Sequence, residues 1–313
     1  MESYRLDNAA LIFPSIISRR ETTLSRIAIT LKNQVQASLL QKALSIIITR
    51  FPYFQVYLRF GFRWPYFRKT ADTPQARPDI FPPCMHIEKD RFLFNVWYRD
   101  KTVAVEFSHI LSDAKGTLLF LNALVYEYCC LTGEINRARY ITNPYFPGTN
   151  IKAEQECAYR KHYRKLPNPP AFPNGYHVPD RLLPKGVYHV TTVFLETGLV
   201  LDIVRKYRTT LNTFFAAVYA LVLADICVAG GGKKSGIVRL EIPINMRQFY
   251  QTDTLRNFSL FLAPAIRVSD AIKPFPEILS LLSEQMKEQM DSGYLERQIA
   301  RNVGSERNWF IHN

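Results

Sequence analysis

The chain has 313 residues, an apolar fraction of 47% and a formal net charge of +13. That apolar fraction is typical of a globular protein, and the length allows one large domain or two smaller ones. A positive net charge favours anionic ligands such as nucleic acid, anionic lipid or a phosphate-rich cofactor. Because Lys and Arg are scattered and no motif of a nucleic-acid-binding fold occurs, we predict no nucleic-acid partner.

The five cysteines are few, odd in number and without a Cys-x-x-Cys pair. This pattern argues against a disulfide framework and against a zinc site, and it favours a reducing compartment. The first residues are polar and lack the apolar segment of a signal peptide. The most apolar run, residues 214–224, is too short to cross a membrane and predicts a buried helix. We therefore expect a cytoplasmic protein without a membrane span or a bound metal.

The N-terminal part predicts a strand followed by a helix. Residues 11–17 favour a short strand or a loop, and residues 25–31 alternate between apolar and polar side chains as a half-buried strand does. In residues 36–50 the apolar side chains recur at helical spacing, with one face toward a core. Pro52 ends that helix, because proline disfavours a helical conformation in the residue before it.

A predicted hairpin follows this helix. Residues 54–59 alternate as a strand, and a turn at Gly61 would carry residues 62–67 back beside it. Four aromatic residues lie in or next to these segments, and we expect them to be core residues: Phe51, Phe54, Phe62 and Trp64.

The segment F-S-H-I-L-S-D-A-K-G links two predicted strands to a predicted helix. Residues 92–98 and 102–107 have the composition and alternation of strands, and residues 117–130 form an apolar run rich in helix formers. His109 would therefore lie at the end of a strand, and Asp113 at the start of a helix. α/β proteins tend to place their chemistry at such a junction.

The pair His-x-x-x-Asp has one chemical interpretation and two structural alternatives. A neutral imidazole accepts a proton well near pH 7, and a nearby carboxylate can orient a ring or a loop. In the structural alternatives, His109 is a packed residue at a strand end, and Asp113 or Ser112 only caps the helix. The spacing alone leaves both interpretations open.

The motif H-I-L-S-D, which begins at His109, resembles the His-x-x-x-Asp-Gly motif of the chloramphenicol acetyltransferase-like superfamily. That superfamily includes peptide-synthetase condensation domains, BAHD acyltransferases, wax ester synthases and alcohol acetyltransferases. This chain departs from the motif twice. Ser108 stands where a second histidine is often found, and Ala114 replaces the glycine after the aspartate, although Gly116 follows closely.

Three further segments look like bacterial alcohol acetyltransferase-type members of the superfamily. They are Y-R-L-D at residues 4–7, R-F-P-Y-F at residues 50–54 and G-F-R-W at residues 61–64. The resemblance covers nearly the whole chain. It implies an α/β fold with two chloramphenicol acetyltransferase-like subdomains, each with mixed sheets and flanking helices.

The composition changes between residues 141 and 188, where prolines recur among charged residues. Such a stretch predicts a linker or a long crossover with little core. We place the domain boundary near residue 175, which gives an N-terminal subdomain of residues 1–175 with the His-x-x-x-Asp motif and a C-terminal subdomain of residues 176–313.

The C-terminal subdomain resumes the alternation of strand and helix. Residues 187–195 predict a strand and residues 198–207 a helix. A second helix, capped by Asn212 or Thr213, would run to Ala224 or beyond. After it, the run G-G-G-K-K lacks the phosphate-loop pattern and follows a helix rather than a strand, so it fits a flexible connector better.

The last part of the chain predicts a strand and two helices. Residues 236–244 have the composition of a strand. A helix would follow Pro276 and run to about Met290, and after a break at Gly293 a polar helix would begin near Leu295. Members of the superfamily usually continue with further strands, so the resemblance implies a C-terminally truncated chain with an incomplete second subdomain.

The resemblance also implies supporting roles for three residues. Arg247 would hold the Asp113 carboxylate across the domain interface and so fix the loop that carries His109. Asn257 would lie near the active-site tunnel as a hydrogen-bond donor, and Gly116 would allow close backbone approach. The alternatives are a surface turn for Arg247 and a turn or cap role for Asn257.

The function that the resemblance implies is acyl transfer from acyl-CoA to a small alcohol or amine. His109 would be the general base, Asp113 would position it, and acyl-CoA would be a cosubstrate without any bound cofactor. One alternative is a condensation-like protein that uses a carrier-bound acyl thioester. The other is a non-catalytic or truncated protein with the acyltransferase fold.

Overall fold

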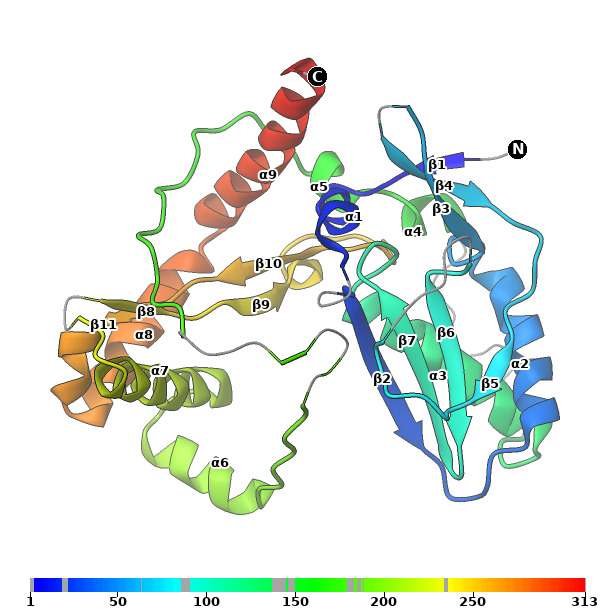
Figure 1. Cartoon of the computed structure of the whole chain (residues 1–313), viewed down its shortest axis with the longest axis horizontal. Helices are drawn as coiled ribbons and strands as arrows, with labels where there is room; N and C mark the ends of the chain where they lie inside the picture. Colours follow the sequence, from blue (N-terminus) through cyan, green and yellow to red (C-terminus); the bar gives the residue numbers. More distant parts are fainter. Residues whose placement is uncertain are drawn as a thin grey trace. The chain divides into compact units, whose positions relative to one another are not determined.

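Figure 1 shows the computed structural model of the chain. It describes residues 3–18, 22–62, 64–85, 91–136, 145, 150–178, 183–184, 187, 189–233 and 236–312, with side chains as far as residue 306. The chain forms two compact units. Unit 1 comprises Met1–His162 and Tyr250–Phe258, and unit 2 comprises Tyr163–Phe249 and Ser259–Asn313. The boundary near residue 175 between an N-terminal and a C-terminal subdomain, which the composition favours, stays a prediction.

Unit 1 is built on a four-stranded sheet of order β2-β7-β6-β5. The central strand β7 pairs antiparallel with β2 and β6, whereas β5 pairs parallel with β6. Both strands that the sequence predicts just before His109 are confirmed. The strands are β2 (Leu24–Thr30), β5 (Ala76–Pro78), β6 (Phe94–Arg99) and β7 (Thr102–Ser108).

A second sheet of unit 1 has the order β1-β4-β3, with both pairings antiparallel. It contains the predicted hairpin, which turns at Gly61. The strands are β1 (Ser3–Arg5), β3 (Val56–Phe60) and β4 (Pro65–Lys69). Phe62, however, is fully exposed and not in the core, because it lies in the turn and not on the packed face of a strand.

Two long helices cover the four-stranded sheet of unit 1 (Figure 1): α2 (Ala37–Arg50) and α3 (Ala114–Leu131). They contact each other, and α3 also contacts β2 and β7. Between helices and sheet lies a cluster of aromatic rings in edge-to-face and stacked contact, formed by Phe51, Phe54, Phe94 and Phe120. The predicted helices of residues 36–50 and 117–130 are confirmed.

The N-terminal segment differs from its prediction as a strand or loop. Residues 9–16 form two short helical turns, η1 (Ala9–Leu11) and α1 (Phe13–Ile16). The Asp7 carboxylate accepts a hydrogen bond from Ala10 N at 2.7 Å, and Pro14 lies in the first turn of α1. A carboxylate before a turn and a proline in its first positions both favour helical geometry.

Part of the proline-rich stretch packs into unit 1, contrary to the prediction of a segment with little core. It contains α4 (Ile151–Glu154) and α5 (Ala158–Lys161). Glu154 is buried and accepts two hydrogen bonds from the Arg50 guanidinium, at 2.8 and 3.1 Å. This bidentate ion pair ties the stretch to the end of α2.

Unit 2 contains two separate two-stranded antiparallel ladders and four longer helices. The ladders are β8 (Ile237–Arg239) with β11 (Ala265–Arg267) and β9 (Ile242–Asn245) with β10 (Ser259–Leu262). The helices are α6 (Thr197–Lys206), α7 (Leu211–Ala229), α8 (Phe275–Gln289) and α9 (Ser292–His312). The described residues of unit 2 also form two short helical turns, η3 (Met246–Gln248) and η4 (Val268–Ile272).

One strand prediction in unit 2 is wrong, and another is confirmed with a break. Residues 189–195 have no strand, and Val190, Val193 and Phe194 are exposed there. β-branched side chains favour a strand only when a partner strand and a packed face are available. The strand predicted at residues 236–244 is split into β8 and β9, which pair with different strands on either side of Pro264, a residue that cannot donate to a ladder.

The helices of unit 2 are confirmed, with shifted ends. The cap of α7 is Thr210 rather than Asn212 or Thr213, and its hydroxyl accepts a hydrogen bond from Thr213 N at 3.1 Å. α8 begins at Phe275, so Pro276 lies in its first turn, and α9 already includes Gly293. Proline lacks the N–H that a first turn leaves unpaired, which explains why it starts α8 instead of preceding it.

The sequence analysis predicted no membrane span because the apolar run at residues 214–224 is short. Helix α7, which contains this run, is longer. It has 19 residues, and it is the one helix of the described chain that is long and apolar enough to cross a membrane. A core helix of a soluble protein passes the same test of length and composition. The finding is therefore weak evidence for a span.

Candidate active site

His109 directly follows the last residue of the central strand β7. Its backbone N–H donates to Thr23 O at 3.1 Å, which continues the β2–β7 ladder by one step. Thr23 has a φ of 56°, in a region that β-branched residues rarely adopt. Backbone strain of this kind is held in place by surrounding structure and often occurs at functional sites.

The His109 ring lies in a partly buried setting between two aromatic rings. Phe13 of α1 stacks on it with ring centroids 5.6 Å apart, and Phe107 meets it edge-on at 5.4 Å. The Ser25 hydroxyl, on β2, lies 3.1 Å from His109 Nε2, within hydrogen-bond distance. The ring is thus held on three sides by residues of unit 1.

Burial lowers the pKa of His109 from its ordinary value, because the charged imidazolium loses hydration. The charge of Asp113 and a hydrogen bond with the Asn257 side chain act in the opposite direction but do not outweigh it. His109 is therefore neutral at pH 7. A neutral imidazole can accept a proton, which is the property that a general base requires.

Asp113 caps helix α3 and also binds a distant segment of unit 1. One carboxylate oxygen accepts a hydrogen bond from Gly116 N at 3.0 Å, and the other accepts one from Phe258 N, also at 3.0 Å. The side chain is almost fully buried. Both oxygens thus bind backbone N–H groups, and this arrangement suits a positioning role for Asp113 rather than a chemical one.

Gly116 lies where the segment before Phe258 approaches α3 most closely. A Cβ at this position would be 2.3 Å from Leu255 O and 2.3 Å from Ser112 Oγ. The Ser112 hydroxyl itself donates to Leu255 O at 2.6 Å. The close approach therefore requires glycine at position 116. Ala114, which stands where the motif usually has glycine, is exposed and is the first residue of α3.

Asn257 connects His109 to a buried carboxylate near the N-terminus. Its amide Nδ2 donates to His109 O at 2.8 Å and to Asp7 Oδ2 at 3.0 Å, and its backbone N–H donates to the same oxygen at 3.3 Å. Asp7 is fully buried. Burial raises the pKa of Asp7, and the nearby Arg256 guanidinium and the donated hydrogen bonds partly offset that effect.

The sequence analysis singled out His109, Asp113, Gly116 and Asn257, and all four lie together in unit 1. It gave no site role to Asp7 or Ser25. Asp7 had a signal, because it belongs to the Y-R-L-D segment that carries the resemblance. Ser25 had none, because its position opposite Phe107 depends on the register of β2 against β7.

Arg247 belongs to unit 2, in the turn η3 that follows β9. Its backbone N–H and its Nη1 both donate to Asn245 Oδ1, at 3.1 and 3.2 Å. The pairing of Arg247 with Asp113 that the resemblance implies would join the two units, and it stays a prediction.

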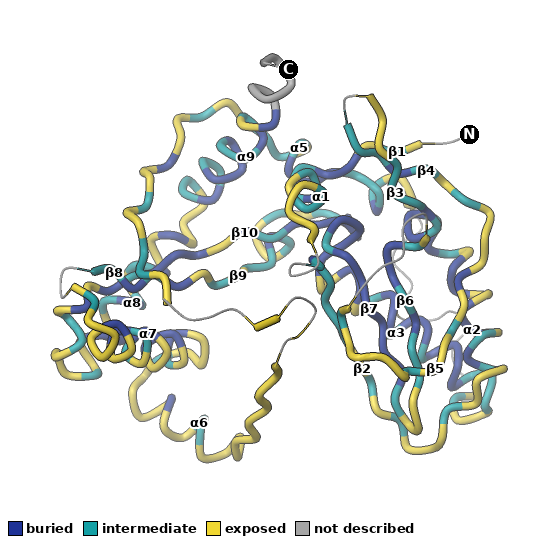
Figure 2. Tube along the Cα trace, in the orientation of Figure 1, coloured by how far each residue is buried: buried dark blue, intermediate teal, exposed yellow. Residues whose placement is uncertain are grey.

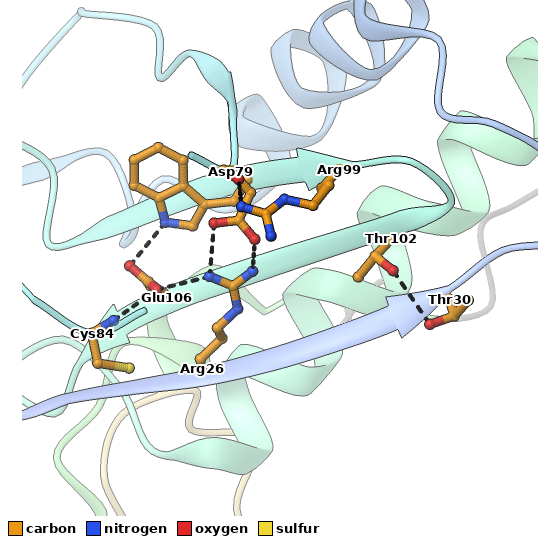
Figure 3. Close-up of polar contacts among 8 residues, drawn as sticks. Arg26, Thr30, Asp79, Cys84, Arg99, Thr102 and Glu106 are labelled. Carbon is orange, nitrogen blue, oxygen red and sulfur yellow. Dashed lines mark hydrogen bonds and ion pairs between the residues drawn. The ribbon is translucent and has the colours of Figure 1, made fainter. Parts of the chain in front are cut away.

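A second buried polar cluster lies on the four-stranded sheet, around Glu106 (Figure 3). Glu106 accepts hydrogen bonds from Arg26 at 3.0 Å, from the Trp97 indole at 2.9 Å and from Cys84 N at 2.9 Å. Arg26 also forms an ion pair with Asp79. Three donors thus bind the Glu106 carboxylate within the sheet.

A cavity of about 420 Å³ lies beside β6, next to this cluster. Aromatic side chains, two arginines and Glu106 line it, whereas His109, Asp113 and Asn257 do not. Among the residues that the structure describes, no group of three or more His, Cys, Asp or Glu side chains is placed to hold a metal ion.

No family model matches this chain, and no curated protein matches it. Solved structures do match. The first condensation domain of the calcium-dependent antibiotic synthetase, in complex with a substrate analogue, matches with a TM-score of 0.63 and 14% identity, over 99% of this chain and 78% of that chain. The chain has the condensation-domain fold.

Two further solved structures share this fold. The starter condensation domain of rhizomide synthetase RzmA, as a mutant in complex with C8-CoA, has a TM-score of 0.61 and 13% identity, over 98% of this chain and 75% of that chain. The X-domain from teicoplanin biosynthesis has a TM-score of 0.57 and 13% identity, over 97% and 74%. Condensation domains belong to the chloramphenicol acetyltransferase-like superfamily, so the predicted α/β fold is confirmed.

Proposed function

We propose that this chain is an acyltransferase that moves an acyl group from an acyl thioester to a hydroxyl or amine. The observation that carries the proposal is His109 at the end of β7: burial keeps its ring neutral, and its backbone carbonyl accepts a hydrogen bond from the Asn257 amide. As the acceptor attacks the thioester carbonyl, His109 takes its proton and then gives a proton to the departing thiolate. Asp113 positions the loop and takes no part in the proton transfer.

For the donor, we propose acyl-CoA as cosubstrate, with no bound cofactor. Two observations support it: a neighbour of the same fold is in complex with C8-CoA, and the net charge of +13 suits a ligand with several phosphates. The competing donor is an acyl group on a carrier protein, which is favoured by the neighbours that belong to peptide synthetases. A small alcohol or amine remains our proposal for the acceptor, and the cytoplasm for the compartment.

The test measures free thiol released from octanoyl-CoA in the presence of small alcohols and amines. We expect His109→Ala and His109→Gln to lower the rate by on the order of 10²- to 10⁴-fold, the usual contribution of a general base. His177→Ala is the matched control, because His177 is exposed and lies in unit 2. Thiol release that survives both His109 variants would rule out the base assignment.

Binding is tested separately from turnover by thermal unfolding. Octanoyl-CoA should raise the midpoint for the parent chain and for His109→Gln alike, since only native-state binding raises stability. A shift with octanoyl-CoA but none with an octanoyl thioester of a short pantetheine would support CoA as the donor. Binding without turnover by any variant would favour the non-catalytic alternative.

A further inference from the structure

Asp7 is a fully buried carboxylate near the N-terminus. Within the described part of the chain it accepts three hydrogen bonds, all from N–H groups: Ala10 N to Oδ1 at 2.7 Å, and Asn257 Nδ2 and N to Oδ2 at 3.0 and 3.3 Å. The charge of the Arg256 guanidinium counteracts the rise in pKa that burial causes. Burying a charge is costly unless it is paired and hydrogen-bonded. Because the proposed proton transfer does not involve Asp7, this burial requires another explanation.

A first connection from Asp7 to His109 runs through the Asn257 side chain. Asn257 Nδ2 carries two hydrogens, and it donates to Asp7 Oδ2 at 3.0 Å and to His109 O at 2.8 Å. Turning the amide over would point its oxygen at a carboxylate and a carbonyl, so both bonds would be lost together. Asn257 is almost fully buried, and water does not readily replace either acceptor. Asp7 therefore sets the orientation of the amide that holds the backbone of His109.

A second connection runs through the helical turns that follow Asp7. The Ala10 N–H that binds Asp7 Oδ1 lies in η1, and a single residue separates η1 from α1. Phe13 is the first residue of α1, and its ring stacks on the His109 ring with centroids 5.6 Å apart. A side-chain oxygen that accepts from the backbone three residues later fixes the start of a helical turn. Asp7 therefore also supports the ring that packs on the imidazole.

One carboxylate thus supports His109 in two ways, with one oxygen for its backbone and the other for the stacking partner of its ring. We propose that Asp7 is a positioning residue for His109, which sets where the imidazole lies relative to the thioester and the acceptor. The proposal rests on the acyl-transfer function proposed above. A displacement of about 1 Å in a catalytic group costs on the order of 10²-fold in rate. Loss of Asp7 should therefore lower kcat rather than weaken donor binding.

The test replaces the carboxylate by an amide of the same shape. Asp7→Asn leaves one acceptor oxygen for three donors and turns an NH₂ group toward other N–H groups. We expect kcat for thiol release from octanoyl-CoA to fall on the order of 10- to 100-fold, with KM for octanoyl-CoA nearly unchanged. The acceptor is the one that gives the parent chain its highest rate. Glu154→Gln is the matched control: it alters another buried carboxylate of unit 1, which binds Arg50, and should keep the parent kcat.

An exchanged pair separates positioning from stability. Asn257→Asp places two carboxylates side by side and removes the donor to His109 O, so both the unfolding midpoint and kcat should fall. Asp7→Asn combined with Asn257→Asp restores an amide–carboxylate pair and should recover much of the midpoint. The His109 carbonyl still lacks its donor, so kcat should stay low. If kcat recovered together with the midpoint, Asp7 would act on stability alone and the proposal would be wrong.

The ring signals of His109 give a readout that needs no turnover. In chain labelled with ¹⁵N-histidine, these NMR signals are identified by their loss in His109→Gln. Asp7→Asn should shift or broaden them, and Glu154→Gln should leave them in place. Phe13→Leu keeps the buried carboxylate intact and removes only the stacked ring, so it tests the second connection even where Asp7→Asn does not fold. Parent signals and parent kcat in Phe13→Leu would contradict that connection.

The outcomes separate this proposal from the function on which it rests. If Asp7→Asn keeps the parent kcat and the parent ring signals, Asp7 does not position His109, although the acyltransferase function stands. If no chain releases thiol but Asp7→Asn changes the ring signals of His109, the acyltransferase function fails and the positioning by Asp7 stands. All rates are measured below the unfolding midpoint of each variant, so that a lost rate is not lost folding.

Discussion

Helix α3 in unit 1 and helix α7 in unit 2 are similar in length and both apolar, but they bury opposite kinds of side chain. α3 has 18 residues and buries large ones, among them Phe120, Leu121 and Leu124. α7 has 19 residues, and most of its buried residues are small: Ala216, Ala217, Ala220, Ala224 and Cys227. Figure 2 shows the contrast as a largely buried trace for α3 and a trace of alternating buried and exposed residues for α7.

The large apolar residues of α7 point to its outer face. Phe215, Tyr219, Val222 and Ile226 recur at helical spacing and are each 41% to 59% exposed. The inner face packs its alanines against α8 and η4. Apolar composition alone therefore does not tell which face of a helix faces the core.

The largest expected difference between the two helices is the effect of removing one phenylalanine ring from each. Phe120→Ala removes a fully buried ring in contact with Phe51, Phe54 and Phe94, and it should cost about 3–5 kcal/mol of unfolding free energy. Phe215→Ala removes a ring that is 41% exposed and should cost about 1 kcal/mol or less. Urea denaturation followed by circular dichroism measures both, and equal losses would contradict the comparison.

The caps of the two helices give the next largest difference. Asp113→Ala removes the α3 cap and leaves Phe258 N buried without its acceptor, so we expect a loss of about 2–3 kcal/mol. Thr210→Ala removes the α7 cap alone and should cost about 1 kcal/mol. Asp113→Asn keeps one acceptor oxygen and should fall between the two. If Asp113→Ala cost no more than Thr210→Ala, the bond to Phe258 would contribute nothing.

The sequence predicts the two helices well and their packing poorly. Helical spacing and cap residues are local signals, so residues 117–130 and the helix beginning near Asn212 are identified within a few positions. The buried face of a helix is decided by the elements that pack against it, and these lie far away in the sequence. The periodicity of apolar residues does not identify these elements. The same limit explains Phe62, whose aromatic ring suggests a core position although it lies in an exposed turn.

The candidate site divides in the same way. The placement of His109 after a strand and of Asp113 before a helix follows from local pattern, and the structure confirms it. Asn257 entered the prediction only through the resemblance. Ser25 was missed because a change in strand register by one residue would turn its side chain to the other face of the sheet. Local sequence thus locates a site residue but does not identify its partners.

A third prediction concerns the alanine face of α7. Ala220→Leu adds a large side chain at a position that is 1% exposed, so overpacking should cost about 1–3 kcal/mol. Val222→Leu, at a residue that is 46% exposed, is the matched control and should change stability by less than about 0.5 kcal/mol. Urea denaturation of both variants measures the difference. An Ala220→Leu chain as stable as the parent would show that the inner face has room for larger residues.

The smallest expected difference between the regions appears on acidification, because one group causes it. The pKa of His109 is lowered in the folded chain, so the unfolded chain binds a proton more readily once the pH falls below about 6.5. The stability from neutral His109 is therefore complete above that pH and is lost as the pH falls through the folded pKa. Asp113 and Asn257 oppose the shift and limit the loss.

Hydrogen–deuterium exchange, corrected for the intrinsic effect of pH, should detect this loss in unit 1. On acidification from about pH 7.5 to about pH 5.5, peptides from β7 and α3 should lose protection relative to peptides from α7. His109→Gln removes the titrating group and should abolish the difference, while His177→Ala, at an exposed histidine, should leave it unchanged. If His109→Gln kept the parent's pH dependence, another group of unit 1 would be responsible, and the buried, neutral His109 on which the proposed chemistry depends would lose its support.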